Sequence, residues 1–159
     1  MLADPCTVNS ADVEERPPLP RQTDGMQPLE AFHHVALTVT DLDRSSEWYE
    51  RVLGMVELFR EDGPDRKAVV YRFEGGGTSV GLVEHVAAVH GPFDETVTGL
   101  DHLAFAVRSE DELHAWATRL DDHGVTHSGP IAVPPGAILN FKDPDGIALA
   151  LFWDRSQNP

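Results

Sequence analysis

The sequence predicts an α+β fold built from two βαβββ modules, and two observations lead to it. Residues 32–54 read as a strand, a turn, a helix and a stop. Residues 101–124 repeat that pattern: the strand that opens with His102 matches the one that opens with His34, and Trp48 and Trp116 lie equally far beyond their histidines. An internal repeat of this kind indicates two copies of one supersecondary unit.

In the first copy, residues 34–39 alternate between two faces, as a half-buried strand does. Residues 40–43 break the alternation and offer acidic helix N-caps such as Asp41. Apolar residues then fall at helical spacing up to Gly54, which stands where a left-handed C-terminal cap belongs. Three further strands are expected at Met55–Arg60, Lys67–Glu74 and Ser79–His85.

The second copy begins at Leu100 and has the same order of elements. Ser109 and Glu112 form a capping-box pattern that opens a helix, and Gly124 is expected to end it. The remaining elements are a short strand, an irregular stretch with three prolines and two final strands, expected at Val125–Ser128, Gly129–Gly136, Ala137–Lys142 and Ile147–Trp153.

The domain organisation follows from composition and from the repeat. Residues 1–29 hold five of the twelve prolines and show no hydrophobic periodicity, which predicts a flexible, Pro-rich acidic arm; an arm that docks or braces a dimer is the alternative. Residues 30–154 are expected to form a single domain. It divides into module one (30–85), a crossover (86–99) and module two (100–154), with a C-terminal tail at 155–159.

The charge of the chain argues against two classes of partner. There are 27 acidic and 12 basic residues, for a formal net charge of −15, whereas nucleic acids and anionic membranes are bound by clustered Lys and Arg. No apolar run approaches the ~20 residues that span a bilayer. The first residues lack a secretory pattern, and the single cysteine permits no internal disulfide, so a cytoplasmic location is expected.

Four short motifs resemble those of the vicinal oxygen chelate superfamily, which includes glyoxalase I, bleomycin-resistance proteins and extradiol dioxygenases. They are HVALTVTDL from His34, WYERVLG from Trp48, DHLAFAV from Asp101 and DPDG from Asp143. The resemblance covers about residues 31–154. It implies that the sheets of the paired modules curl into one open barrel-like cleft, that the cleft holds a divalent ion in metal-using members, and that the chain forms a homodimer.

The same resemblance maps four metal-ligand positions onto this chain. His34 and His102 fill two of them, while Gly81 and Ala150 stand where carboxylates are usual. A catalytic divalent site generally has at least three protein ligands, so two imidazoles alone would bind a metal weakly. His85 is a candidate third ligand; other candidates are a group from a partner chain, His90, Asp94 and Glu95. An iron, manganese, nickel or zinc ion and no metal at all are equally compatible with this set.

If both histidines face the cleft, strand alternation decides which side chains lie beside them. Most of these neighbours are small: Ala36, Thr38, Ser79, Gly81, Ala104, Ala106, Ala148 and Ala150. We therefore expect a roomy, mostly apolar pocket, with further lining from Tyr71, Asn140 and Phe152. The alternative is that Phe93, the N-terminal arm or a partner chain fills this space.

Three functions fit these expectations. The first is a metal-assisted enzyme of isomerase, lyase or dioxygenase type, in which the ion polarises oxygens of a small oxygenated or aromatic molecule. The second is a metal-free protein that binds and sequesters a ligand, as bleomycin-resistance proteins do. The third is metal-free acid–base catalysis by a histidine. No catalytic residue can be named, and glyoxalase I activity is not expected because both carboxylate positions are lost.

Overall fold

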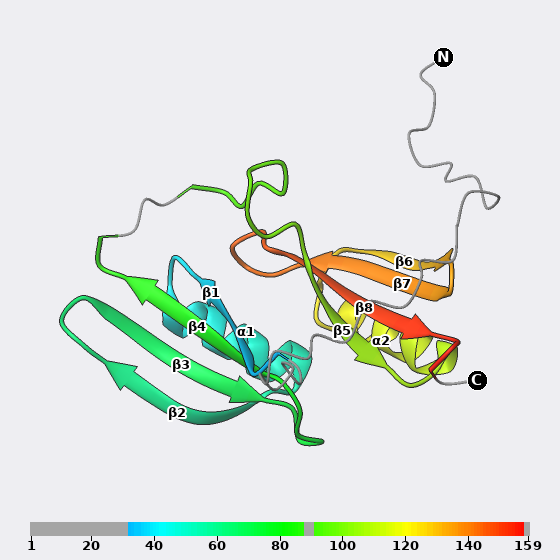
Figure 1. Cartoon of the computed structure of the whole chain (residues 1–159), viewed down its shortest axis with the longest axis horizontal. Helices are drawn as coiled ribbons and strands as arrows, with labels where there is room; N and C mark the ends of the chain where they lie inside the picture. The colour runs from blue at the N-terminus through cyan, green and yellow to red at the C-terminus, as the bar shows by residue number, and fades with distance from the viewer. Residues whose placement is uncertain (1–31, 88–90, 158–159) are drawn as a thin grey trace, which may run out of the picture. The chain divides into compact units, whose positions relative to one another are not determined.

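The computed structural model describes residues 32–87 and 91–157 (Figure 1). The expected arm at 1–29 and the candidate ligand His90 lie outside these residues. Both modules belong to one compact unit. In the described part of the chain, no helix is long and apolar enough to cross a membrane.

Each module folds into a four-stranded sheet with one helix. Module one contains β1 (His34–Thr38), α1 (Leu42–Leu53), β2 (Val56–Asp62), β3 (Arg66–Arg72) and β4 (Ser79–His85), with strand order β1-β4-β3-β2. Module two contains β5 (Leu103–Val107), α2 (Glu110–Asp122), β6 (His127–Val133), β7 (Gly136–Lys142) and β8 (Ala148–Asp154), with order β5-β8-β7-β6. In each sheet the first strand pairs parallel with the last, and the other pairs are antiparallel. The predicted α+β fold with two βαβββ modules is confirmed, and the two sheets of the described chain do not close into a barrel.

The ends of α1 are set by local signals. Asp41 has extended backbone geometry, and its side chain accepts a hydrogen bond from the Arg44 backbone N–H at 2.9 Å. A second carboxylate, that of Glu84 on β4, accepts from the Leu42 N–H at 2.8 Å. At the other end Gly54 has φ 68°, the left-handed conformation that a glycine adopts at least cost. The helix therefore begins and ends where the sequence predicts.

A capping box also opens α2. The Ser109 side chain accepts from the Glu112 N–H at 3.1 Å, and the Glu112 carboxylate accepts from the Arg108 N–H at 2.7 Å. The second bond reaches one residue further back than in the usual box. The helix ends at Asp122 and is capped by His123, and the next residue, Gly124, has the left-handed φ of 68°.

One expected irregular stretch is a strand. Residues 129–136 were expected to be irregular because they contain three prolines, but β6 runs from His127 to Val133 and pairs with β7. β6 lies at the edge of its sheet, where a proline without an N–H costs no ladder hydrogen bond on the outer side. The register shifts between His127 and Pro130, which lets the strand accommodate the proline.

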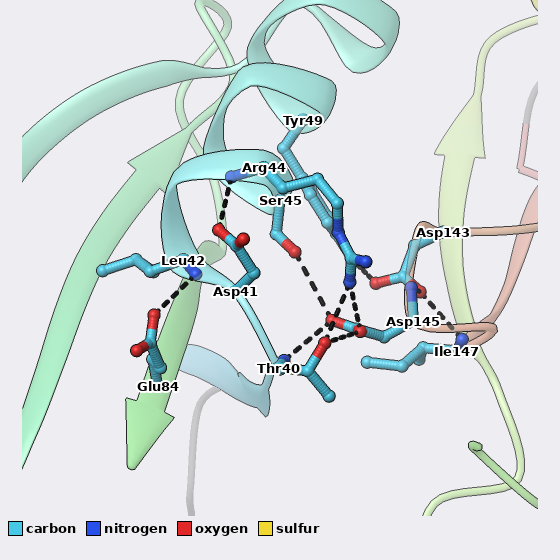
Figure 2. A network of polar contacts seen from close by, with 10 residues as sticks. All are labelled: Thr40, Asp41, Leu42, Arg44, Ser45, Tyr49, Glu84, Asp143, Asp145 and Ile147. Atoms are coloured by element: carbon cyan, nitrogen blue, oxygen red, sulfur yellow. Dashed lines mark hydrogen bonds and ion pairs between the residues drawn. The ribbon is translucent and has the colours of Figure 1, made fainter. Parts of the chain in front are cut away.

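The two modules meet along α1, and a network of polar contacts joins them at its N-terminal end (Figure 2). Asp145, in the turn between β7 and β8, accepts from the backbone N–H of Thr40 at 3.0 Å and from the Thr40 hydroxyl. The Arg44 guanidinium also donates to Asp145, and the Ser45 hydroxyl lies 3.4 Å from it. We call the contact surface between the two modules the seam. Within it, the buried Tyr49 hydroxyl donates to Asp143 at 3.0 Å. These contacts join module one to module two directly, without a ligand.

Candidate functional site

His34 and His102 hold equivalent places in the two modules. His34 is the first residue of β1 and lies opposite Ser79 of β4, while His102 directly precedes β5. Both side chains are exposed, as are the small residues that follow on the same faces, Ala36, Thr38, Ala104 and Ala106. We call the two surfaces that carry these residues the open faces of the modules.

Each histidine has a neighbour at the same ring nitrogen. The Nδ1 atom of His102 lies within hydrogen-bonding distance of the Asp101 carboxylate, and the Nδ1 atom of His34 lies 3.0 Å from Nδ1 of His33. A carboxylate at Nδ1 fixes the orientation of an imidazole and leaves Nε2 available to a ligand. The Nε2 atom of His102 therefore remains available to donate a hydrogen bond to a ligand or to accept one from it.

The donor set of the described residues does not fit a resident divalent ion. None of their His, Cys, Asp and Glu side chains form a group of three or more that is suited to a metal. Ala150 is fully buried and pairs with Ala104, so no oxygen ligand enters at that position. His85 lies at the opposite end of β4 from Ser79 and hence from His34, about 20 Å away at ~3.3 Å per residue.

The two acidic candidates from the crossover have other partners. The Asp94 carboxylate accepts from the backbone N–H of Thr96 at 2.9 Å and from its hydroxyl at 2.6 Å, and these bonds hold the pKa of Asp94 below its usual value. Glu95 lies 3.9 Å from the Lys142 ammonium group. Neither joins His34 or His102 in a metal-binding group.

A cavity of about 750 Å³ lies between the modules and continues around the free edge of β5; we call it the seam cavity. One wall comes from module one and the other from module two, with Leu53, Phe73, Val80, Phe105, Trp116 and Leu151 among the lining residues. These are mainly side chains from the faces that carry the helices. At the edge of β5 the cavity also reaches His102, Ala104 and Ala106 on the open face of module two.

The seam cavity is lined by uncharged side chains. Among the described residues, no Asp, Glu, Lys or Arg lines this cavity, although such residues make up 25% of the chain. The rings of Phe73 and Phe105 meet edge to face with centroids 5.3 Å apart, and Thr78 and His102 supply polar groups. Two other hollows, of about 510 and 450 Å³, both contain charged side chains. The seam cavity alone among these three therefore suits an uncharged, largely apolar ligand.

The structure brings only some of the predicted site residues together. His102, Ala104 and Ala106 line the seam cavity, and His102, Asn140 and Ala148 line the hollow of about 510 Å³ beside it. The other predicted residues line none of these three cavities: His34, Ala36, Thr38, Tyr71, Gly81, His85, Ala150 and Phe152. The two histidines thus share no cavity among the three.

Tyr71 lies on the other side of its sheet from the predicted pocket. It is fully buried, its hydroxyl donates to the Glu50 carboxylate of α1 at 2.9 Å, and burial raises its pKa to about 12. Its neighbour Val70 pairs with Gly81 and takes the open face instead. The expectation that Tyr71 lines the pocket is therefore wrong. The faces assigned to this strand were shifted by one residue, and Val70 takes the place expected for Tyr71.

The apolar walls of the seam cavity were not anticipated from the sequence. Leu53, Phe105 and Trp116 carry the pattern of core residues, because they belong to the buried faces of their helices and strands. A pattern within one module cannot show that two such faces meet imperfectly and leave a cavity. The one available signal was the repeat itself, which implies a contact surface between two similar units.

Comparisons with known proteins agree with this architecture. A sequence profile of the glyoxalase/bleomycin resistance protein/dioxygenase superfamily matches residues 31–151. A catechol-2,3-dioxygenase of Bacillus subtilis is 32% identical over 79% of this chain, and a putative ring-cleaving dioxygenase, MhqA, of the same organism is 26% identical over 80%. This chain spans 42% and 41% of their respective lengths.

A solved structure gives the same result. The glyoxylase/bleomycin resistance protein/dioxygenase domain from Frankia sp. EAN1pec superposes with a TM-score of 0.75 at 39% identity, covering 80% of this chain and 100% of that domain. The match includes both βαβββ modules. This chain therefore belongs to the glyoxalase/bleomycin resistance protein/dioxygenase superfamily.

Proposed function

We propose that this protein binds a small, uncharged and largely apolar molecule in the seam cavity, without a resident metal. The observation that carries the proposal is the cavity itself: about 750 Å³, lined without charged residues and bordered by an aromatic pair. A volume of this size accommodates a drug-sized ligand. His102, oriented by Asp101, offers one directional hydrogen bond at the edge.

A binding role is favoured over a reaction by what surrounds the cavity. Apart from His102, the described residues that line it include no side chain that would act as an acid or base near neutral pH. The described residues also provide no three-ligand metal group. Sequestration of the bleomycin-resistance type requires neither.

Binding is tested with N-phenyl-1-naphthylamine, a neutral apolar dye that fluoresces when it leaves water. We expect saturable, stoichiometric binding. Phe105→Ala should weaken it about tenfold, which corresponds to ~1.4 kcal/mol for a lost aromatic contact. Thr78→Trp places a large ring from an exposed turn beside the cavity and should also weaken binding.

The matched control is Ala36→Ser, at an exposed position on the open face of module one and outside the cavity. It should bind the dye as the wild type does. Circular dichroism of each variant shows that the fold is retained. Absence of saturable binding to the wild type, or equal loss in the control, would contradict the proposal.

A second candidate is a metal-assisted enzyme of isomerase, lyase or dioxygenase type. It is supported by the Asp101–His102 pair and by the sequence similarity to two dioxygenases. The third ligand would have to come from a second copy of the chain or from residues outside those described. Metal analysis of untagged protein decides: near-stoichiometric iron, manganese, nickel or zinc that is lost in His34→Ala supports this candidate. No metal, even after each ion is added, rejects it.

We also propose a homodimer. The exposed small residues of the open faces, such as Ala36 and Ala104, form surfaces that a second copy of the chain could cover. Within one chain, His34 and His102 share none of the three cavities. In a dimer, the His34 of one copy would lie near the His102 of the other. Sedimentation equilibrium at several protein concentrations measures the assembly, and a monomer throughout would rule this proposal out.

A further inference from the structure

Arg119 of α2 crosses the seam and binds the C-terminal end of α1. Its Nε donates to the Val52 carbonyl oxygen at 2.7 Å, and its Nη2 donates to the Arg51 carbonyl oxygen at 2.8 Å. The last four carbonyls of a helix have no partner within the helix and form the negative end of its dipole. A guanidinium group with two parallel donors satisfies two of them at once.

The same side chain also contacts one wall of the seam cavity. The guanidinium carbon lies 5.5 Å from the centroid of the Trp116 ring, which is within the range of a cation–π contact. Trp116 lines the cavity from module two, and Leu53, the residue after Val52, lines it from module one. Arg119 thus contacts the ring of one wall and the backbone beside the other.

We propose that Arg119 is a positioning residue that sets the width of the seam cavity and thereby the size of ligand that it accepts. The proposal rests on ligand binding in that cavity. Because Arg119 fixes the end of α1 against Trp116, it holds Leu53 and Trp116 at a set separation. A lysine has the charge but not the two-donor fork, so it would hold only part of this geometry.

A purely stabilising role is distinguished from a positioning role by a second tie on the same helix. The contacts of Asp145 with Thr40 and Arg44 join the same two modules at the other end of α1. None of these three residues lines the seam cavity. Loss of the Asp145 contacts should therefore lower the stability of the protein and leave its preference for ligand size unchanged.

The experiment uses 4-alkylphenols from 4-ethylphenol to 4-nonylphenol, which share one polar group, are neutral at pH 7 and differ only in length. Their dissociation constants are measured by displacement of N-phenyl-1-naphthylamine from the wild type, Arg119→Met, Arg119→Lys and Asp145→Asn. We expect the ratio of dissociation constants between the shortest and longest phenol to change about fivefold or more in Arg119→Met. The change should be intermediate in Arg119→Lys and absent in Asp145→Asn.

The outcomes separate the two proposals. If the wild type binds the series and Arg119→Met keeps the same length preference, Arg119 does not set the cavity width, although ligand binding stands. If Asp145→Asn alters the preference as much as Arg119→Met, the effect reflects loosened modules and the positioning role is rejected. If the wild type binds no member of the series and no dye, the binding function fails and this inference with it.

Discussion

Asp143 and Asp145 lie in the same turn, yet their surroundings move their pKa values in opposite directions. Burial raises the pKa of Asp143, and hydrogen bonds from the Ile147 N–H and the Tyr49 hydroxyl only partly offset it. Burial also disfavours ionisation of Asp145, but the bonds from Thr40 and the charge of Arg44 outweigh it and hold its pKa below the usual value. Of the two carboxylates, Asp145 is the one whose charged form stabilises the folded protein.

The pH dependence of stability should reveal this charge. A carboxylate with a lowered folded-state pKa contributes fully above its unfolded pKa of ~3.9, and the contribution is lost as the pH falls through the folded pKa. Asp145→Asn should therefore lower the free energy of unfolding by about 1–2 kcal/mol at pH 7, and by progressively less below about pH 4. Asp143 is present in both proteins, but the charge of Asp145 contributes to its raised pKa, so Asp145→Asn also removes that repulsion and offsets part of the loss at pH 7.

Urea unfolding of the two proteins at pH 7, 5, 4 and 3 gives this difference directly. Asp43→Asn serves as the control, because the Asp43 side chain is 93% exposed and its ion pair with Arg60 lies on the surface. It should change stability by less than about 0.5 kcal/mol at pH 7. A deficit in Asp145→Asn that stays constant from pH 7 to 3 would show that the charge of Asp145 does not stabilise the fold.

At the scale of one element, the β7–β8 hairpin depends on a close backbone approach at Gly136. Gly136 pairs with Asp154, and a Cβ placed on Gly136 would overlap the backbone carbonyl of Trp153. Backbone atoms within a sheet cannot move aside as a flexible side chain would. The position therefore requires glycine for space and not for backbone conformation.

Gly136→Ala should destabilise the protein by more than about 2 kcal/mol, measured as the free energy of unfolding in urea. Gly75 provides the matched control, since a Cβ there meets no atom within 4 Å and its φ is not left-handed. Gly75→Ala should change stability by less than about 0.5 kcal/mol. Equal losses in both variants would mean that crowding at Trp153 is not the cause.

The elements that sequence reasoning located correctly are those with local signals. Asp41, Gly54 and Ser109 fix helix ends through contacts within a few residues, so the pattern contains them. Two errors came from contacts distant in sequence. A short strand was expected at Val125–Ser128, whereas β6 runs from His127 to Val133, because only the sheet shows that Pro130 lies at an edge. The face of Tyr71 depends on the pairing of Val70 with Gly81.

For the whole molecule, the least predictable feature is the seam between the modules. The repeat shows that two similar units exist, but not which of their faces meet. Contacts of high sequence separation decide this, such as Tyr49 with Asp143 and Arg119 with Val52. The open faces were expected to share one cleft, whereas the cavity with an uncharged lining includes the faces that carry the helices. A cavity at the seam is a property of the assembled pair of modules.

Polar contacts join α1 to module two near both of its ends. If these contacts hold the two modules together, removing both sets should let the modules unfold separately. The Asp145 contact reaches α1 at Arg44 and the Arg119 contacts reach it at Arg51 and Val52, so the two lie at least about 10 Å apart along the helix at ~1.5 Å per residue and have no partner in common. Asp145→Asn and Arg119→Met should each lower the free energy of unfolding by about 1–3 kcal/mol and keep a single transition. Sites this far apart usually combine additively as long as the native structure persists.

In the double variant the seam keeps the Tyr49–Asp143 hydrogen bond and apolar contacts such as the Trp48–Phe141 stack. We expect these contacts to be too few to make the modules unfold together, so the double variant should depart from two-state unfolding. Unfolding is followed by tryptophan fluorescence with Trp153 of β8 replaced by Phe in every protein, so that the signal comes from Trp48 and Trp116, which both lie at the seam. Far-ultraviolet circular dichroism reports on all helices and strands. We expect the fluorescence transition to precede the dichroism transition in the double variant and to coincide with it in each single variant. Coincident transitions in the double variant, with additive losses, would show that apolar packing alone makes the two modules one cooperative unit.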